Sequence, residues 1–90
     1  MIIKKYNMSK DIAEQLLLKG FSAATYYQPY EYTYYYLPYK SPLDDTITFI
    51  NKNGIWIVNI ICNGKNFKST IQTIQQFNNL MDLMDINFRL

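Results

Sequence analysis

The chain has 90 residues, of which 49% are hydrophobic and 18% charged, and nine basic against seven acidic side chains give a net charge of +2. This length and composition predict a single compact domain over residues 1–90, and they exclude the disordered class of protein. The weak, scattered charge disfavours a dedicated duplex-DNA binder, and no apolar run approaches the roughly 20 residues that a membrane-spanning helix needs.

The first predicted element is a helix over residues 10–19. Ser9 has a side chain suited to an N-cap, and Gly20 stands where a helix often ends in a left-handed residue. Phe21 is placed to make the hydrophobic contact that follows such an end. The apolar stripe of this helix consists of Ile12, Ala13, Leu16 and Leu17.

Residues 21–39 are predicted to be extended, because they are rich in β-branched and aromatic residues and hold eight tyrosines. Pro29 and Pro38 bracket the densest part, and proline cannot donate to a β-ladder, so this part suits an edge strand or strand ends. Alternate side chains of an extended chain share a face, and one face would carry Tyr30, Tyr32, Tyr34 and Tyr36. The opposite face, which we expect to pack on the core, would carry Glu31, Thr33, Tyr35 and Leu37.

A β-hairpin is the clearest structural signal in the sequence. Residues 46–50 and 55–62 flank the dipeptide Asn53-Gly54, and Asn-Gly is the strongest short-range sign of a tight hairpin turn. A two-residue turn would pair Lys52 with Ile55, and therefore Phe49 with Val58. A four-residue loop would shift the register by two and leave the faces unchanged. Alternation then gives a core face of Ile47, Phe49, Trp56, Val58, Ile60 and Cys62. The opposite, mixed face would carry Thr46, Thr48, Ile50, Ile57 and Asn59.

A second Asn-Gly dipeptide, at Asn63-Gly64, predicts a turn into a short strand over residues 65–68, with Cys62 paired to Lys65. Ser69 opens a sequence with the form of a capping box, so a second helix is predicted from there to about Met84. Its apolar stripe consists of Ile71, Ile74, Phe77, Leu80, Met81 and Met84. Residues 85–90 alternate polar with apolar side chains, and we expect them to form a last strand or to cover the core.

Together these elements predict an α+β fold. It has a small antiparallel sheet of three to four strands, with an N-terminal and a C-terminal helix packed on one face. Two amphipathic helices need an apolar surface to cover, and the core face of the hairpin supplies it.

The residues give little support to catalysis or metal binding. The chain has no histidine, which removes the commonest general base and metal ligand, and its only thiol, Cys62, belongs to the predicted core face. Asp44-Asp45 are typical of a turn, and Asp82 with Asp85 are typical of a solvated helix face. The three glycines stand at turns and a helix end, so no phosphate-binding loop is present. We therefore expect no enzymatic activity, no cofactor and no metal site.

The tyrosines form the candidate interaction site. An aromatic side chain buries roughly 150–250 Å² when it is covered, and one side of a standard protein interface is roughly 800 Å². Four tyrosines on one face are therefore comparable with an interface, and tyrosine gives large contact area with few rotamers to freeze. Two other interpretations stay open, a purely structural role and stacking on single-stranded nucleic acid. The predicted partner-binding residues are Tyr30, Tyr32, Tyr34, Tyr36, Tyr39 and Lys40.

The predicted function is a non-enzymatic binding protein that occludes a site on a protein partner. Abundant Ile, Asn, Lys and Tyr with a single Arg are typical of an AT-rich genome. In size and composition, although in no motif, the chain is similar to the small inhibitors that phages make against host or defence proteins, including anti-CRISPR proteins. With no signal-peptide pattern and one cysteine, the expected location is cytoplasmic, in the host cytoplasm for a phage protein.

The sequence is also compatible with two alternative functions. One is a nucleic-acid-binding regulator that stacks bases on tyrosine; a faint helix-turn-helix pattern over residues 11–27 gives it little support, because its glycine comes too late for the turn. The other alternative is a structural or self-assembling protein, for which a homodimer is the simplest form.

Overall fold

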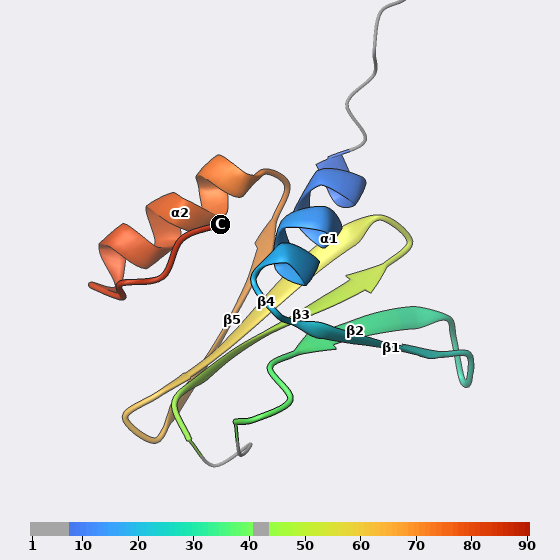
Figure 1. The fold of residues 1–90 in the computed structure, drawn as a ribbon, viewed down its shortest axis with the longest axis horizontal. Helices are drawn as coiled ribbons and strands as arrows, with labels where there is room; N and C mark the ends of the chain where they lie inside the picture. Colours follow the sequence, from blue (N-terminus) through green and yellow to red (C-terminus); the bar gives the residue numbers. More distant parts are fainter. Residues whose placement is uncertain (1–7, 41–43) are drawn as a thin grey trace, which may run out of the picture.

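The computed structural model describes residues 8–40 and 44–90 and confirms an α+β fold. All five strands are antiparallel and lie in the order β1-β2-β3-β4-β5, so each strand pairs with its neighbours in the chain. Figure 1 shows both helices on one side of the sheet, α2 near β5 and α1 further toward β1. The elements are α1 (Met8–Leu18), β1 (Ser22–Tyr26), β2 (Tyr32–Tyr36), β3 (Thr46–Lys52), β4 (Ile55–Cys62), β5 (Lys65–Ile71) and α2 (Ile74–Leu83).

The predicted number of strands was too small, because the tyrosine-rich segment is a hairpin of two strands. β1 and β2 pair from Ser22↔Tyr36 to Tyr26↔Tyr32, and the side-chain oxygens of Thr25 and Thr33 are hydrogen-bonded across the pair at 3.1 Å. Pro29 lies in the connection between the strands, where its missing N–H costs no ladder bond. The second helix of the faint helix-turn-helix pattern is thus strand β1.

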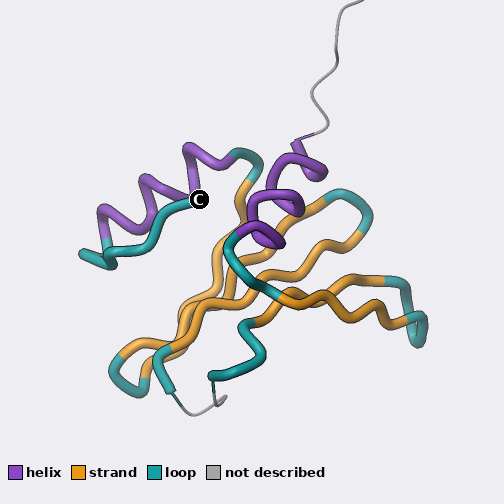
Figure 2. Tube along the Cα trace, viewed as in Figure 1, coloured by secondary structure: helices purple, strands orange, loops and turns teal. Residues whose placement is uncertain are grey.

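The two Asn-Gly turns have the predicted geometry. Asn53 and Gly54 have φ angles of 53° and 78°, and Asn63 and Gly64 have 53° and 75°. Positive φ at both central residues is the mark of the type I′ turn, whose twist matches that of the strands. The registers are those of two-residue turns, with Lys52 opposite Ile55 and Cys62 opposite Lys65. Figure 2 shows the resulting long strands as the centre of the molecule.

The end of α1 is also as predicted. Gly20 has a φ of 91°, its N–H donates to the Leu17 carbonyl at 3.1 Å, and the Phe21 N–H donates to the Leu16 carbonyl at 3.0 Å. This pair of bonds defines a Schellman motif, and the buried side chains of Phe21 and Leu16 belong to the same core cluster. The start differs, because α1 begins at Met8 and Ser9 is therefore a helical residue instead of the N-cap.

The second helix begins later than predicted. β5 runs on to Ile71, and the N-cap of α2 is Thr73, whose hydroxyl accepts a hydrogen bond from the Gln76 N–H at 3.0 Å. The Gln76 side chain in turn accepts from the Gln72 N–H at 2.7 Å. Thr73 and Gln76 thus provide the cap that the sequence pattern placed at Ser69, although the reciprocal bond comes from Gln72, the residue before the N-cap. Ile71 is buried as a strand residue.

The core lies between the sheet and the two helices. Tyr35, Phe49, Trp56, Val58 and Ile60 from the sheet are buried, and α1 and α2 each add two buried side chains. Aromatic rings meet edge-on within it, for example Phe21 and Phe49 with ring centroids 5.7 Å apart. Such edge-to-face pairs are a favourable arrangement of ring quadrupoles. Helix residues of the core are Ile12, Leu16, Phe77 and Met81.

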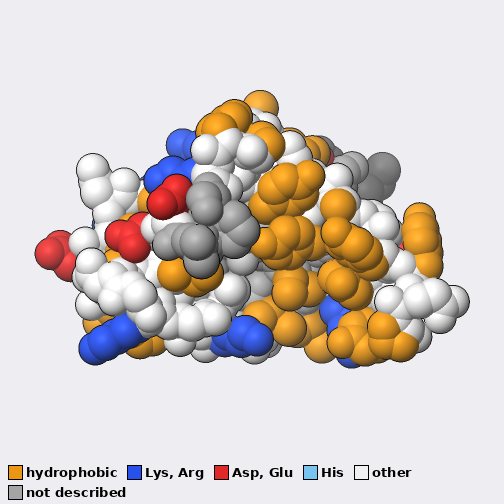
Figure 3. Space-filling view, turned by 90° about the horizontal axis from the view of Figure 1, so that it is seen from below, with side chains coloured by type: hydrophobic (Ala, Val, Ile, Leu, Met, Phe, Trp, Pro, Cys, Tyr) orange, Lys and Arg blue, Asp and Glu red, His pale blue; other side chains and the backbone are white. Residues whose placement is uncertain are grey.

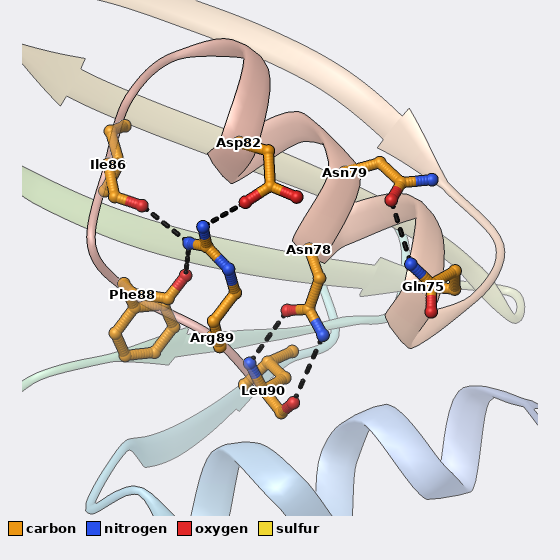
Figure 4. Close-up of polar contacts among 8 residues, drawn as sticks. All are labelled: Gln75, Asn78, Asn79, Asp82, Ile86, Phe88, Arg89 and Leu90. Atoms are coloured by element: carbon orange, nitrogen blue, oxygen red, sulfur yellow. Dashed lines mark hydrogen bonds and ion pairs between the residues drawn. The ribbon is translucent and has the colours of Figure 1, made fainter.

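Residues 85–90 cover the core and form no strand. Ile86, Phe88 and Leu90 pack against the core cluster. The Asn78 side chain accepts from the Leu90 N–H at 3.0 Å and donates to the Leu90 carbonyl at 3.3 Å, as Figure 4 shows. Arg89 forms an ion pair with Asp82 at the end of α2. The tail is thus tied to the helix that it follows.

Candidate functional site

One face of the sheet lies opposite the helices, and we call it the open face. Strand register places there eight tyrosine or isoleucine side chains, all at least partly accessible to solvent. An antiparallel sheet with one solvated face commonly carries polar residues on that face, so this composition is unusual. Seen from below, hydrophobic side chains, tyrosine included, gather over the half of the molecule that carries β1 and β2 (Figure 3). The eight are Tyr26, Tyr32, Tyr34, Tyr36, Ile50, Ile55, Ile57 and Ile61.

The tyrosines of this face contact one another. The rings of Tyr26 and Tyr32 are stacked across the β1–β2 pair, with centroids 5.1 Å apart and planes at 19°. Tyr34 and Tyr36 are stacked along β2, at 5.4 Å and 18°. Stacked rings use their flat faces on each other, which leaves edges and hydroxyl groups for other contacts. We call Tyr26, Tyr30, Tyr32, Tyr34 and Tyr36 the tyrosine patch.

The two faces of β2 differ as the alternation predicted. Tyr32, Tyr34 and Tyr36 lie on the open face, and Tyr35 is buried on the core face with its ring centroid 5.2 Å from that of Trp56. Burial raises the pKa of the Tyr35 hydroxyl above its ordinary value, because the phenolate would lose solvation there. The strand therefore uses one tyrosine for the core and three for the open face.

Tyr30 reaches the patch from outside the strand. It lies in the bend before β2, so it is not part of the predicted period-two ladder. Its ring centroid is nevertheless 5.8 Å from that of Tyr32, and the Lys52 ammonium lies over the ring, 3.6 Å from its centroid. A cation over an aromatic face is attracted by the ring quadrupole, so Lys52 ties this loop to β3.

Tyr39 and Lys40 lie in the turn after β2, apart from the ladder. The Tyr39 hydroxyl lies 2.9 Å from the point where a Cβ on Gly20 would stand, so Tyr39 contacts the end of α1 instead of the tyrosine patch. Lys40 lines a groove together with Tyr36. The structure thus brings five of the six predicted residues to one region and separates Tyr39 from them.

A groove of about 340 Å³ runs beside the tyrosine patch. Its walls come from β1, β2, the turn after β2, β3 and β4. On β4, the Asn59 side-chain oxygen is buried and has no hydrogen-bond partner in the described part of the chain. A buried acceptor of this kind costs free energy until a donor reaches it. The residues that line the groove include Tyr34, Tyr36, Lys40, Asn59 and Ile61.

The charge on the open face is positive. Register places Lys52 and Lys68 there, and none of the five strands contains an aspartate or glutamate. Two acidic side chains are engaged outside the strands: Asp82 pairs with Arg89, and Asp45, just before β3, accepts from the Asn63 N–H at 3.1 Å. A partner for the open face would therefore meet cations at its margins and no carboxylate within the strands.

The remaining chemistry of the described residues is sparse. Cys62 is partly buried against the core. Within residues 8–40 and 44–90, no three His, Cys, Asp or Glu side chains are grouped so that they could hold a metal ion. Neither of the helices in these ranges has the length and apolar character required to cross a membrane.

Several residues of the open face were not among the predicted site residues. Tyr26, Ile50, Ile55, Ile57 and Ile61 join the face only once β1 pairs with β2 and β2 with β3. The sequence signal that would have found them is the pair of extended runs on either side of residues 27–31, which have the spacing of a hairpin with a five-residue loop.

Comparison of the chain with protein-family models, with curated proteins and with solved structures found no match.

Proposed function

We propose that the chain is a non-enzymatic protein that binds another protein through the open face and acts by occluding a site on it. The observation that carries this proposal is the uncovered apolar surface of the sheet, built from the tyrosine patch and four isoleucines. Exposed apolar patches of this kind commonly mark interaction sites. The small size of the chain and its residue usage, typical of an AT-rich genome, favour a phage-type inhibitor or regulator of a host or defence protein, similar in kind to anti-CRISPR proteins.

The arrangement of the tyrosines favours a protein over a nucleic acid. Single-stranded nucleic acid binds by stacking bases on accessible ring faces. Here Tyr26 and Tyr32, and likewise Tyr34 and Tyr36, already stack on each other. The middle of the open face is aliphatic, with Ile50 directly opposite Ile57. Ring edges, hydroxyls and aliphatic side chains are suited to the mixed apolar and polar contacts of a protein interface.

The groove supplies a point of specificity within this face. Its aromatic wall accepts an apolar side chain, and the unpaired Asn59 oxygen accepts a hydrogen bond from a donor that enters with it. A partner that donates a hydrogen bond to this oxygen gains more binding free energy than it would from the same bond at the rim of the face, because the acceptor is already desolvated.

The test is capture of a partner by the purified protein, followed by measurement of the affinity for that partner. We expect the double substitution Tyr32→Ser and Tyr34→Ser to weaken binding by about 100-fold or more, since tyrosine hot spots often carry about 2 kcal/mol or more each. The matched control is Phe67→Ser with Leu83→Ser, which removes two exposed apolar side chains elsewhere. Equal affinities for the two double variants would contradict the proposal.

Nucleic-acid binding is the second candidate, and one observation favours it. Lys40, Lys52 and Lys68 lie around the open face without a carboxylate in any strand. This candidate predicts that single-stranded oligonucleotides bind and that their affinity falls steeply with salt. It also predicts that Lys52→Gln with Lys68→Gln reduces binding as much as the tyrosine substitutions do. Salt-independent or absent oligonucleotide binding would remove it.

A further inference from the structure

The two edges of the sheet are unlike each other. β5 is one edge strand, and it carries Lys65 and Lys68. Charged side chains, lysine above all, discourage an edge strand from pairing with another chain. β1 is the other edge, and its sequence is Ser-Ala-Ala-Thr-Tyr, with no charge and no proline. The edge formed by β1 therefore has none of the side chains that block strand addition.

Exposed apolar side chains flank this unprotected edge strand in the sequence. Leu17 and Leu18, at the end of α1, are 55% and 78% exposed, and Tyr26 and Tyr27, at the end of β1, are 47% and 68% exposed. These four residues are among the nine large hydrophobic side chains that are exposed in the described part of the chain. They flank β1 on both sides in sequence, and Figure 1 shows the end of α1 leading directly into β1.

We propose that β1 pairs in antiparallel fashion with β1 of a second copy of the chain, about a two-fold axis at Ala24. This inference does not depend on the proposed function. In this register Ser22 of each copy stands opposite Tyr26 of the other, and Ala24 stands opposite Ala24. Small side chains thus face the one large side chain of the strand, which lets each Tyr26 lie across the other strand.

A second copy suits this edge in charge and in symmetry. A two-fold contact brings each residue against its own partner position, so a charged strand would repel itself, and β1 has no charge to repel. The continuous sheet keeps the open faces of both copies on one side and the α1 helices on the other. Leu17 and Leu18 of the two copies then come toward each other on the helix side.

The contact is small, and this sets its expected strength. A standard interface needs about 800 Å² from each partner, and two tyrosines contribute about 150–250 Å² each when fully covered. Two leucines and a short β-ladder add to this buried area, and the total area stays at the lower end of the range for specific protein interfaces. We therefore expect a dissociation constant of roughly 10–100 μM.

Sedimentation velocity of the purified protein tests the pairing, over a loading range of about 5–500 μM around the expected constant. The average mass should rise toward that of a dimer with concentration. Ala24→Lys places like charges directly opposite each other at the axis, and we expect it to weaken association by about tenfold or more. The matched control, Thr70→Lys, adds the same charge to the same face on β5, and it should dimerise as the unmodified protein does.

A second variant distinguishes loss of the dimer contact from loss of folding. Leu18→Lys changes a side chain that is 78% exposed, so it should fold normally and still weaken the dimer. A monomer at every concentration would overturn the proposal, as would a dimer that resists both Ala24→Lys and Leu18→Lys. A dimer lost only in Thr70→Lys would place the contact on β5 and would equally overturn it. Ile57→Thr, on the open face of β4 and away from β1, should leave self-association unchanged, which keeps this result separate from the test of partner binding.

Discussion

At the scale of single residues, Gly20 shows how a backbone requirement outweighs a close contact. Its φ of 91° is costly for any L-residue, and a left-handed conformation costs about 1–2 kcal/mol. An added Cβ would also meet the Tyr39 hydroxyl, but Tyr39 is 77% exposed and can rotate away at little cost.

We therefore expect Gly20→Ala and Gly64→Ala to lower the free energy of unfolding by similar amounts, about 1–2 kcal/mol each. Gly64 is the matched control, because its φ is 75° and a Cβ there meets nothing within 4 Å. Urea denaturation measures both. A much larger loss for Gly20→Ala that disappears in a Tyr39→Phe background would show that Tyr39 is held in place.

Tyr35 predicts a dependence of stability on alkaline pH. Its folded-state pKa is raised by burial, so the unfolded chain releases this proton at a lower pH than the folded protein does. Stability is then fully retained below about pH 10 and falls as the pH rises through the folded-state pKa. We expect Tyr35→Phe to reduce this alkaline loss, measured as the urea midpoint between about pH 8 and 11. An identical pH profile for the variant would contradict the assignment.

At the scale of elements, the cap of α2 separates the observed helix start from the predicted one. Thr73 accepts from the Gln76 N–H, whereas Ser69 lies in β5. We expect Thr73→Ala to cost about 1 kcal/mol of stability, as is typical of lost N-caps. Ser69→Ala should cost clearly less. Thermal denaturation of the two variants decides between the two starts, and a larger loss from Ser69→Ala would favour the predicted one.

The elements that could be predicted are those whose cause is local. Asn53-Gly54 and Asn63-Gly64 take a backbone conformation that these residue types favour, so the position of both turns and the faces of their strands followed from the sequence. The β1–β2 hairpin was missed because its connection has no such dipeptide. The start of α2 was misplaced because Ser69 and Thr73 both begin capping patterns, and only the pairing of β5 with β4 keeps residues 69–71 in the sheet.

At the scale of the whole molecule, the sheet has a core face and an open face, and one strand contains a matched pair of residues to compare them. Ile60 is buried on the core face of β4, and Ile57 lies partly exposed on the open face. Ile60→Thr should cost about 2–4 kcal/mol, from lost packing and a buried hydroxyl, and Ile57→Thr about 1 kcal/mol or less. Chemical denaturation measures both. Similar losses would mean that the open face is covered in solution.

The candidate site could be predicted in part. Alternation along β2 was enough to separate Tyr32 and Tyr34 from Tyr35, because the side-chain period of a strand is fixed. It could not place Tyr26 or Ile57 beside them, since those neighbours depend on which strands pair. Nor could it show that the tyrosine rings stack on one another, which is a matter of rotamers in the folded sheet.

The chain-neighbour order of the strands has a consequence for how the molecule acquires its structure. Every strand joins the sheet beside the one made just before it, through connections at residues 27–31, 37–45, 53–54 and 63–64. The loops that must close are short, and proteins dominated by such local contacts cross their folding barrier quickly. We expect the main refolding phase to finish within roughly milliseconds to tens of milliseconds. Stopped-flow fluorescence can follow it, because the single tryptophan, Trp56, becomes buried between Tyr35 and Phe49. A main phase of seconds would mean that the sheet assembles in another order.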